Sequence, residues 1–164
     1  MVLWRPPHRR HFLMVWQFCV VSEAKADLLG QKPLANISGY ANHSQSPASF
    51  IIAQSGAVSK LLHTANGKRC GFDLFEINGT ALVVALSMVA ELSIDRKAVN
   101  VNGGACIIGH ICGCSGARII VALIHALMKR NLKRGVAAIC IGGGEAIAIC
   151  RIITSRLRQP CRRT

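Results

Sequence analysis

The segment from Val99 to Arg118, VNVNGGACIIGHICGCSGAR, constrains the fold most, because it joins a short β-like run to a long apolar helix. It contains five glycines, three cysteines and one histidine. Glycine permits tight turns and close backbone approach, and Ser115 is a favourable N-cap that would leave the first N–H groups of the helix facing the loop. The spacing of Gly109, Gly113 and Gly116 does not match G-x-G-x-x-G, and no Lys-Ser/Thr pair follows a glycine in this loop. We therefore predict a functional loop that is neither of the two common phosphate-binding loops.

Strand and helix patterns alternate along the rest of the chain. A short helix is predicted from Ser22 to Leu29, with Gly30 as its stop. The further elements predicted from periodicity are strands over 34–40, 72–77, 136–141 and 146–153, and helices over 55–65, 81–92 and 116–128. This order indicates an α/β layered domain with a mixed β-sheet. The helices over 81–92 and 116–128 are apolar on nearly all sides, which predicts that both are buried. We expect 42–49 to be a surface loop and Gly142–Gly144 to be the turn between the last two strands.

Composition and charge narrow the class of protein. The 164 residues suffice for one domain, and 51% hydrophobic with 16% charged residues excludes a disordered chain. A net charge of +13 would suit a nucleic acid or an anionic membrane. However, basic residues concentrate at the two ends of the chain, and no basic stripe interleaves with aromatics. We interpret the ends as solvated tails and do not expect a nucleic-acid partner.

The eight cysteines do not follow a disulfide or zinc pattern. Five of them lie in apolar or Gly-rich surroundings, which predicts buried free thiols and a reducing compartment: Cys106, Cys112, Cys114, Cys140 and Cys150. Cys112-x-Cys114 has no second pair at finger or ribbon spacing, so no metal is expected. We predict a cytoplasmic location, with a mitochondrial one as the alternative.

Residues 1–21 allow three interpretations. The basic start followed by the apolar run Phe12–Val21 has the outline of a secretory signal peptide, and the lack of acidic residues before Glu23 permits a mitochondrial presequence. The third interpretation, which we favour, is a divergent segment that replaces the strand expected to begin the domain. The apolar run is too short to span a bilayer.

Three ordered motifs carry a family resemblance. They are FEIN ending at Asn78, the loop N-x-N-G-G-A followed by G-H and S-G-A-R, and CIGGG starting at Cys140. Together they resemble the C-terminal half of the thiolase family, in particular the biosynthetic acetyl-CoA acetyltransferases. The resemblance continues more weakly back to 22–41. Three motifs in order are far more specific than any one alone.

The resemblance implies a layered thiolase-like half, with 1–21 as a divergent N-terminal segment, 22–154 as the domain and 155–164 as a basic tail. The reaction would be Claisen condensation or thiolysis of short acyl-CoA thioesters. No cofactor is implied, because coenzyme A enters as part of the substrate. Besides the acyl-CoA substrate, the expected partner is a second copy of the chain or a thiolase.

The resemblance also implies roles for individual residues. Cys140 would be the acid/base that moves a proton at the acetyl C2, and His110 would donate to the thioester oxygen. Asn78 would hold a water that serves as the second oxyanion donor. Five glycines would shape the substrate-binding loops: Gly103, Gly104, Gly109, Gly142 and Gly143. By residue type alone, Asn78, His110 and Cys140 would each be interpreted as a structural residue.

The sequence also departs from the family pattern. N-E-A-F is replaced at 78–81 by Asn-Gly-Thr-Ala, Ile111 stands where proline follows the histidine, and Glu145 adds an acid after the glycine triplet. The half that bears the nucleophilic cysteine is not found before Ser22, and Cys19 lacks the setting of a nucleophile. We therefore expect the chain to be inactive alone. The alternatives are a non-catalytic thiolase-fold remnant that binds a thiolase partner and, supported only by charge, a basic nucleic-acid binder.

Overall fold

A four-stranded mixed sheet forms the centre of the molecule. The computed structural model describes residues 2–3, 18–64, 71–79 and 82–153, so the terminal arginine clusters, apart from the backbone of residue 151, lie outside the described residues. The strand order is β3 (Ala35–Ser44), β6 (Glu145–Ile153), β5 (Arg134–Ile141) and β4 (Leu74–Asn78). β6 is antiparallel to both of its neighbours, whereas β4 and β5 are parallel. This arrangement confirms the predicted α/β class.

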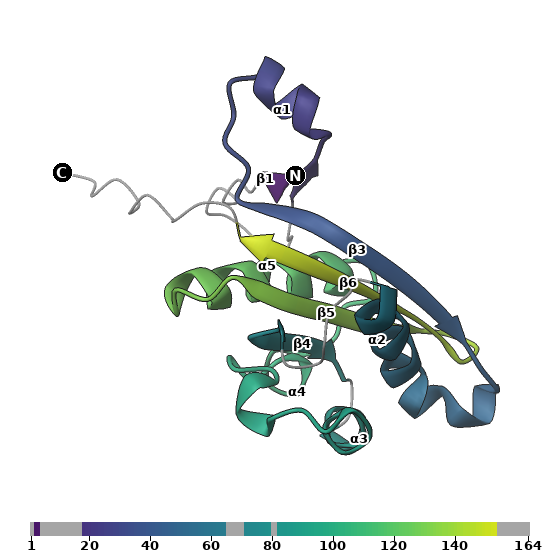
Figure 1. The fold of residues 1–164 in the computed structure, drawn as a ribbon. Coiled ribbons are helices and arrows are strands. Elements are labelled where there is room, and N and C mark those ends of the chain that lie inside the picture. Colours follow the sequence, from purple (N-terminus) through teal and green to yellow (C-terminus); the bar gives the residue numbers. More distant parts are fainter. Residues whose placement is uncertain (1, 4–17, 65–70, 80–81, 154–164) are drawn as a thin grey trace.

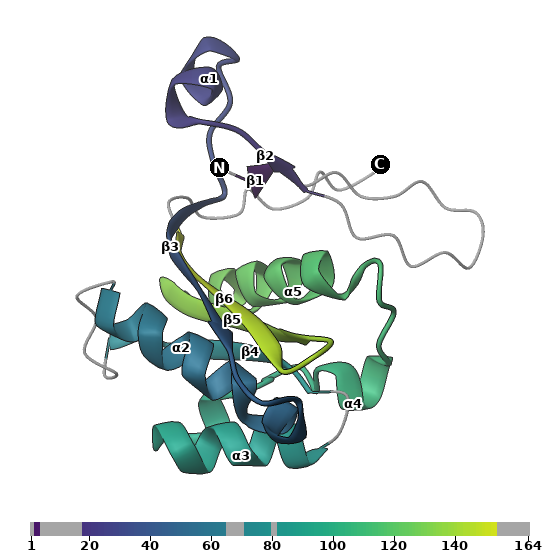
Figure 2. The ribbon, with the colours of Figure 1, turned by 90° about the vertical axis from the view of Figure 1, so that its right-hand side faces the viewer.

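Helices cover both faces of the sheet. Helices α2 (Ala53–Thr64) and α3 (Leu82–Leu92) lie on one face, and α5 (Ser115–Lys129) lies on the other (Figure 1, Figure 2). The first core cluster joins Leu61 and Met88 to the strands, and the second joins Leu123 and Leu127 of α5 to β4 and β5. A Cβ at Gly135 of β5 would lie 2.7 Å from Leu123 Cδ1, so α5 packs very closely on the sheet.

The N-terminal region contains α1 (Glu23–Leu28) as predicted. Ser22 caps it by accepting a hydrogen bond from Lys25 N at 3.2 Å, and Gly30, with φ +60°, follows its end. The short strands β1 (Val2–Leu3) and β2 (Cys19–Val20) pair with each other. In Figure 1, α1 stands away from the central sheet. No helix among the described residues is long and apolar enough to cross a membrane.

Strand β3 is longer than predicted. It continues to Ser44 because each of its last residues pairs with β6, out to the pair Ser44 and Glu145. Of the predicted loop over 42–49, the first three residues belong to the strand, and a 3-10 helix, η1 (Pro47–Ile52), begins shortly after. The polar composition of this end of β3 conceals a strand whose pairing comes from distant residues.

The predicted burial of α3 was wrong. Only Val84, Met88 and Leu92 are buried, whereas Leu82 is 59% exposed and Leu86 is 41% exposed. One stripe of the helix packs on the core, and the side with Leu82 and Leu86 is only partly covered by the other described residues. Helix α5, by contrast, is largely buried as predicted.

The cysteine prediction was correct only in part. Cys150 is buried, and Cys114 and Cys140 are half-buried, but Cys106 and Cys112 are exposed. Cys106 lies in the short helix α4 (Ala105–Ile108) and Cys112 lies in the loop before α5, so neither belongs to the sheet. All six cysteines among the described residues are free thiols.

Candidate active site at the ends of strands β4 and β5

The glycine-rich loop, residues 99–114, is attached to the free edge of β4 by the side chain and backbone of Asn100. Its side-chain oxygen accepts from Ile77 N at 2.7 Å, its side-chain nitrogen donates to Ile77 O at 3.0 Å, and its own N–H donates to Phe75 O at 2.8 Å. Asn100 adopts φ +48°, a conformation that asparagine tolerates better than most residues. The first asparagine of the loop motif therefore serves to fix the loop against the strand that ends at Asn78.

Three of the predicted glycines shape this loop by adopting positive φ. Gly103 has φ +94°, Gly104 has φ +61° and Gly109 has φ +86°. A Cβ on Gly104 would lie 2.9 Å from the carboxamide of Asn100, so this position has no room for a side chain. The short helix α4 (Ala105–Ile108), which the sequence analysis did not predict, fits between Gly104 and Gly109.

Asn78 and His110 lie together, as the resemblance implied. Asn78 Nδ2 is 3.2 Å from His110 Nδ1, and the same ring nitrogen is 2.7 Å from Ser115 Oγ. Ser115 Oγ also accepts from Ile111 N at 3.2 Å. The imidazole itself is exposed, and its Nε2 lies 3.9 Å from the exposed Cys112 Sγ. The ring is thus held by one nitrogen while the other faces the surface.

Ser115 does not have its predicted role. The N-cap of α5 is Cys114, and Ser115 is the first helical residue, fully buried. Its hydroxyl binds His110 and the Ile111 N–H instead of capping the helix. Ile111 follows the histidine in place of proline, so its free N–H provides one of these contacts.

A buried ion pair between Arg118 and Glu76 holds the side chain of Asn78 in place. Arg118 Nη2 donates to Asn78 Oδ1 at 2.9 Å, and Arg118 Nη1 lies 3.5 Å from Glu76 Oε1. The exposed fractions are 1% for Asn78, 2% for Glu76 and 4% for Arg118. Burial raises the pKa of Glu76 to about 7, and the neighbouring Arg118 opposes that shift. Gln54, at the start of α2, completes the support by donating to Asn78 O at 3.0 Å.

Glu76 and Arg118 were not predicted as site residues. They belong to the motifs FEIN and S-G-A-R, for which the family resemblance implied no role at these two positions. The available signal was a lone carboxylate in a buried strand pattern and a lone arginine in an otherwise apolar helix, since buried charges are usually paired.

Cys140 reaches the same end of the sheet on the neighbouring strand. The register pairs Asn78 with Ile139, so Cys140 lies one residue further along β5. Its cross-strand partner Ala146 belongs to the core cluster under α2 and α3, which puts Cys140 on that face, whereas Asn78 meets α5 on the other. Among the described residues, no hydrogen bond joins Cys140 to Asn78 or His110. The convergence of all three groups stays a prediction.

The glycine triplet after Cys140 forms the predicted hairpin turn. Gly143 and Gly144 adopt φ +82° and +88°. A Cβ on Gly144 would lie 2.5 Å from Gln45 O, whereas one on Gly142 would meet open space. Gly144 therefore has a structural requirement that the predicted binding residue Gly142 lacks.

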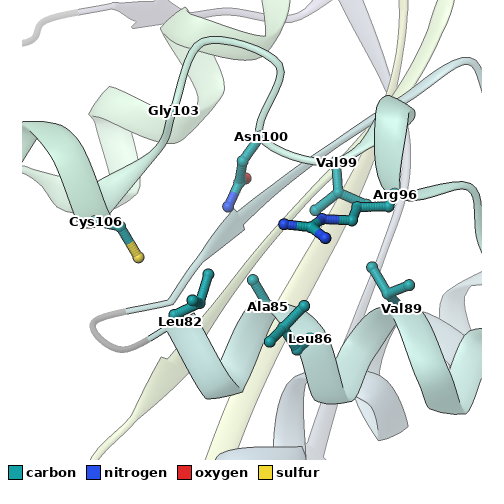
Figure 3. Close-up of a pocket in the computed structure, with 9 residues that line it drawn as sticks. All are labelled: Leu82, Ala85, Leu86, Val89, Arg96, Val99, Asn100, Gly103 and Cys106. Carbon is teal, nitrogen blue, oxygen red and sulfur yellow. The ribbon is translucent and has the colours of Figure 1, made fainter.

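A separate cavity of 170 Å³ lies between α3 and the loop that starts at Val99 (Figure 3). Its walls are mostly apolar, with Arg96 and Cys106 at its border, and Gly103 is the one predicted site residue that lines it. Cys106 Sγ lies 3.7 Å from Gly79 O. The cavity contains none of the three groups Asn78, His110 and Cys140. Within the described ranges, no cluster of three or more His, Cys, Asp or Glu side chains could hold a metal ion.

The structure is a mixed α/β domain with an imidazole and an amide at the end of a parallel strand, and comparisons with known proteins identify the family of this domain. The family model described as thiolase, C-terminal domain, matches residues 31–153. A probable acetyl-CoA acetyltransferase from Dictyostelium discoideum is 48% identical over 130 residues, which is 79% of this chain and 31% of the relative. The acetyl-CoA acetyltransferase of Cupriavidus necator is 42% identical over 130 residues, again 79% of this chain and 33% of the relative.

Solved structures give the same result. The crystal structure of the Bacillus anthracis acetyl-CoA acetyltransferase has a TM-score of 0.78 and 40% identity, over 81% of this chain and 34% of that one. The human mitochondrial 3-ketoacyl-CoA thiolase also has a TM-score of 0.78, with 36% identity and the same coverage. The chain belongs to the thiolase family and matches its C-terminal domain. It spans about a third of the length of the relatives it matches.

Proposed function

We propose that this domain provides the oxyanion donor and the proton-transfer group for a thiolase reaction on short acyl-CoA thioesters, either Claisen condensation or thiolysis. The observation that carries the proposal is the contact between Asn78 and His110 at the end of β4. Because Nδ1 of the ring is engaged by Asn78 and Ser115, Nε2 is the nitrogen available to a thioester oxygen. An oxyanion donor of this kind contributes about 3 to 4 kcal/mol to transition-state stabilisation.

Cys140 is the proposed acid/base of the reaction. It is half-buried at the end of β5, close to Gly142 and Gly143, where a Cβ would meet open space. The thiolate form of a cysteine can accept the proton from the acetyl C2 and thereby become the thiol, and nearby hydrogen-bond donors or dipoles favour the thiolate. Because Asn78 and Cys140 lie on different faces at the same sheet end, the thioester would lie across the ends of β4 and β5.

We further propose that the 164-residue chain does not turn over when assayed alone. In the family, the acyl group is carried by a cysteine of the N-terminal half, and the match here is with the C-terminal domain. Loss of a covalent nucleophile lowers kcat by several orders of magnitude.

The test is a complementation assay. The chain would be assayed for thiolysis of acetoacetyl-CoA with CoA, alone and together with the N-terminal two-thirds of the Dictyostelium relative. We expect turnover only in the mixture, reduced about 100-fold or more by His110→Gln and abolished by Cys140→Ala. Turnover that neither substitution affects would refute the proposed roles.

A second candidate function is a non-catalytic thiolase fold that binds a thiolase partner. The observation that favours it is the set of exposed apolar side chains on α3 and in the glycine-rich loop, including Leu82 and Ile107, which is 78% exposed. Such side chains gathered on one surface are typical of interaction sites. A stable complex with the N-terminal fragment, without turnover, would support this function over the catalytic one.

A further inference from the structure

The hydrogen-bond pattern around His110 is determined by groups that can only donate. The guanidinium of Arg118 has no acceptor, so the Asn78 atom 2.9 Å from it is the amide oxygen. The amide nitrogen of Asn78 then faces His110 Nδ1 at 3.2 Å. Because an amide nitrogen also only donates, Nδ1 must accept and carries no proton in this contact. The neutral ring therefore carries its proton on Nε2.

Ser115 is compatible with this pattern. Its oxygen already accepts from Ile111 N, and its hydroxyl is free to rotate and donate to Nδ1 at 2.7 Å. A hydroxyl could equally accept from a protonated Nδ1, so Ser115 alone does not select a tautomer. The selection comes from Asn78, and the orientation of Asn78 comes from Arg118.

The burial of Asn78 and Arg118 prevents the amide of Asn78 from adopting the rotated orientation. Asn78 and Arg118 are 1% and 4% exposed, so water cannot replace either partner if the amide rotates. A rotated amide would present its NH₂ group to the guanidinium, which leaves buried donors facing each other. Glu76, 3.5 Å from the other guanidinium nitrogen, balances the charge of Arg118.

We propose that Arg118 is a positioning residue: from its buried ion pair with Glu76 it fixes the amide of Asn78, and through that amide it holds neutral His110 as the Nε2–H tautomer. The catalytic value of this tautomer rests on the proposed function, because Nε2–H is the donor that a thioester oxygen would meet. The tautomer itself can be measured without any reaction.

The experiment is long-range ¹H–¹⁵N NMR on the ¹⁵N-labelled full chain at alkaline pH, where a free imidazole is neutral. His110 is assigned among the six histidines by comparison with His110→Gln. We expect the wild-type ring to be mainly the Nε2–H tautomer. The double variant Glu76→Gln/Arg118→Met removes the guanidinium without leaving a lone buried charge. It should lower the ratio of Nε2–H to Nδ1–H about fivefold, the effect of one neutral hydrogen bond.

The matched control is Arg130→Met. Arg130 follows the other end of α5, and its guanidinium also donates to an asparagine, at 3.5 Å from Asn102 Oδ1. This variant should leave the His110 tautomer unchanged. An unchanged tautomer ratio in the folded double variant would overturn the proposal.

If the double variant does not fold, Asn78→Asp provides an independent test. A carboxylate at this position can only accept, so His110 should switch to a proton on Nδ1. A ring that stays Nε2–H in Asn78→Asp would overturn the proposal. If the tautomer responds as expected while the complementation assay shows no turnover, the proposed function fails and the positioning role stands. If the mixture turns over but the tautomer ratio is unchanged in the double variant, the proposed function stands and the positioning role of Arg118 fails.

Discussion

The two sides of the candidate site are built in different ways. On the α5 side, Glu76, Arg118, Asn78 and His110 form a chain of four side chains joined by contacts between 2.9 and 3.5 Å, and the first three are buried. On the other side, Cys140 is positioned by strand register and by a glycine turn, and none of the described side chains hydrogen-bonds to its thiol. Both sides carry a recognisable family motif.

This comparison shows what a motif match specifies. It identifies the residue and the strand end that carries it, but it does not specify what orients the side chain. A group oriented by buried polar contacts is fixed to within a narrow geometry, whereas a group placed by backbone alone keeps its rotamer freedom. The difference predicts that the two sides respond differently to mutation.

The largest effect is expected for Arg118→Met, which leaves Glu76 buried without its partner. We expect a loss of about 3 to 5 kcal/mol in the free energy of unfolding at pH 8, measured by urea denaturation. In a Glu76→Gln background the same substitution should cost less, since no carboxylate is left unpaired. Equal losses in both backgrounds would mean that the ion pair does not support this side of the site.

On the Cys140 side, Gly144→Ala should cost about 1 to 3 kcal/mol. The residue has φ +88° and its Cβ would lie 2.5 Å from a backbone oxygen of Gln45. Gly142→Ala is the matched control in the same turn, because its Cβ would meet open space, and it should change stability by about 0.5 kcal/mol or less. If both variants unfolded at the same urea concentration, the proposed structural requirement for glycine at position 144 would be contradicted.

A pH effect on stability is expected on the α5 side. The pKa of Glu76 is raised from 4.5 to about 7 by burial, so between these values the native state binds a proton that the unfolded state has lost. Stability contributed by this group is therefore present below pH 4.5 and lost as the pH rises to 7, by about 1 kcal/mol per pH unit. The difference in stability between wild type and Glu76→Gln, followed by thermal unfolding across this range, should show this slope. A constant difference would contradict it.

The smallest effect is expected for Cys140→Ala, about 1 kcal/mol or less, because the thiol is half-buried and makes no hydrogen bond with the described residues. Cys150→Ala, on the paired strand, is the control. Cys150 is fully buried and its sulfur lies 3.1 Å from Ser38 Oγ, so its loss should cost more. Urea denaturation of both variants would decide this. A larger loss for Cys140 would indicate that its thiol is fixed as firmly as His110.

Much of the fold was predictable from local pattern. The helix predicted over 55–65 is observed at Ala53–Thr64, and the strand predicted over 72–77 is observed at Leu74–Asn78. These two elements and the hairpin turn at 142–144 were predictable because each depends on periodicity or on turn residues close in sequence. The polar end of β3 was not predicted, because its pairing partner lies about a hundred residues away. The exposure of α3 was missed for a related reason. Periodicity reports which residues are apolar, but not whether another segment covers them.

By itself, the sequence determined the order of most strands and helices, because these depend on periodicity and on turn residues. The resemblance of its three motifs indicated the family and the placement of Asn78 and His110 in one site. Only the tertiary structure decided which contacts hold those residues. The packing of α5 against β4 brings Arg118 between Glu76 and Asn78, across forty positions of sequence. Local patterns contain no information on such a contact, because it exists only when two distant segments exclude water between them.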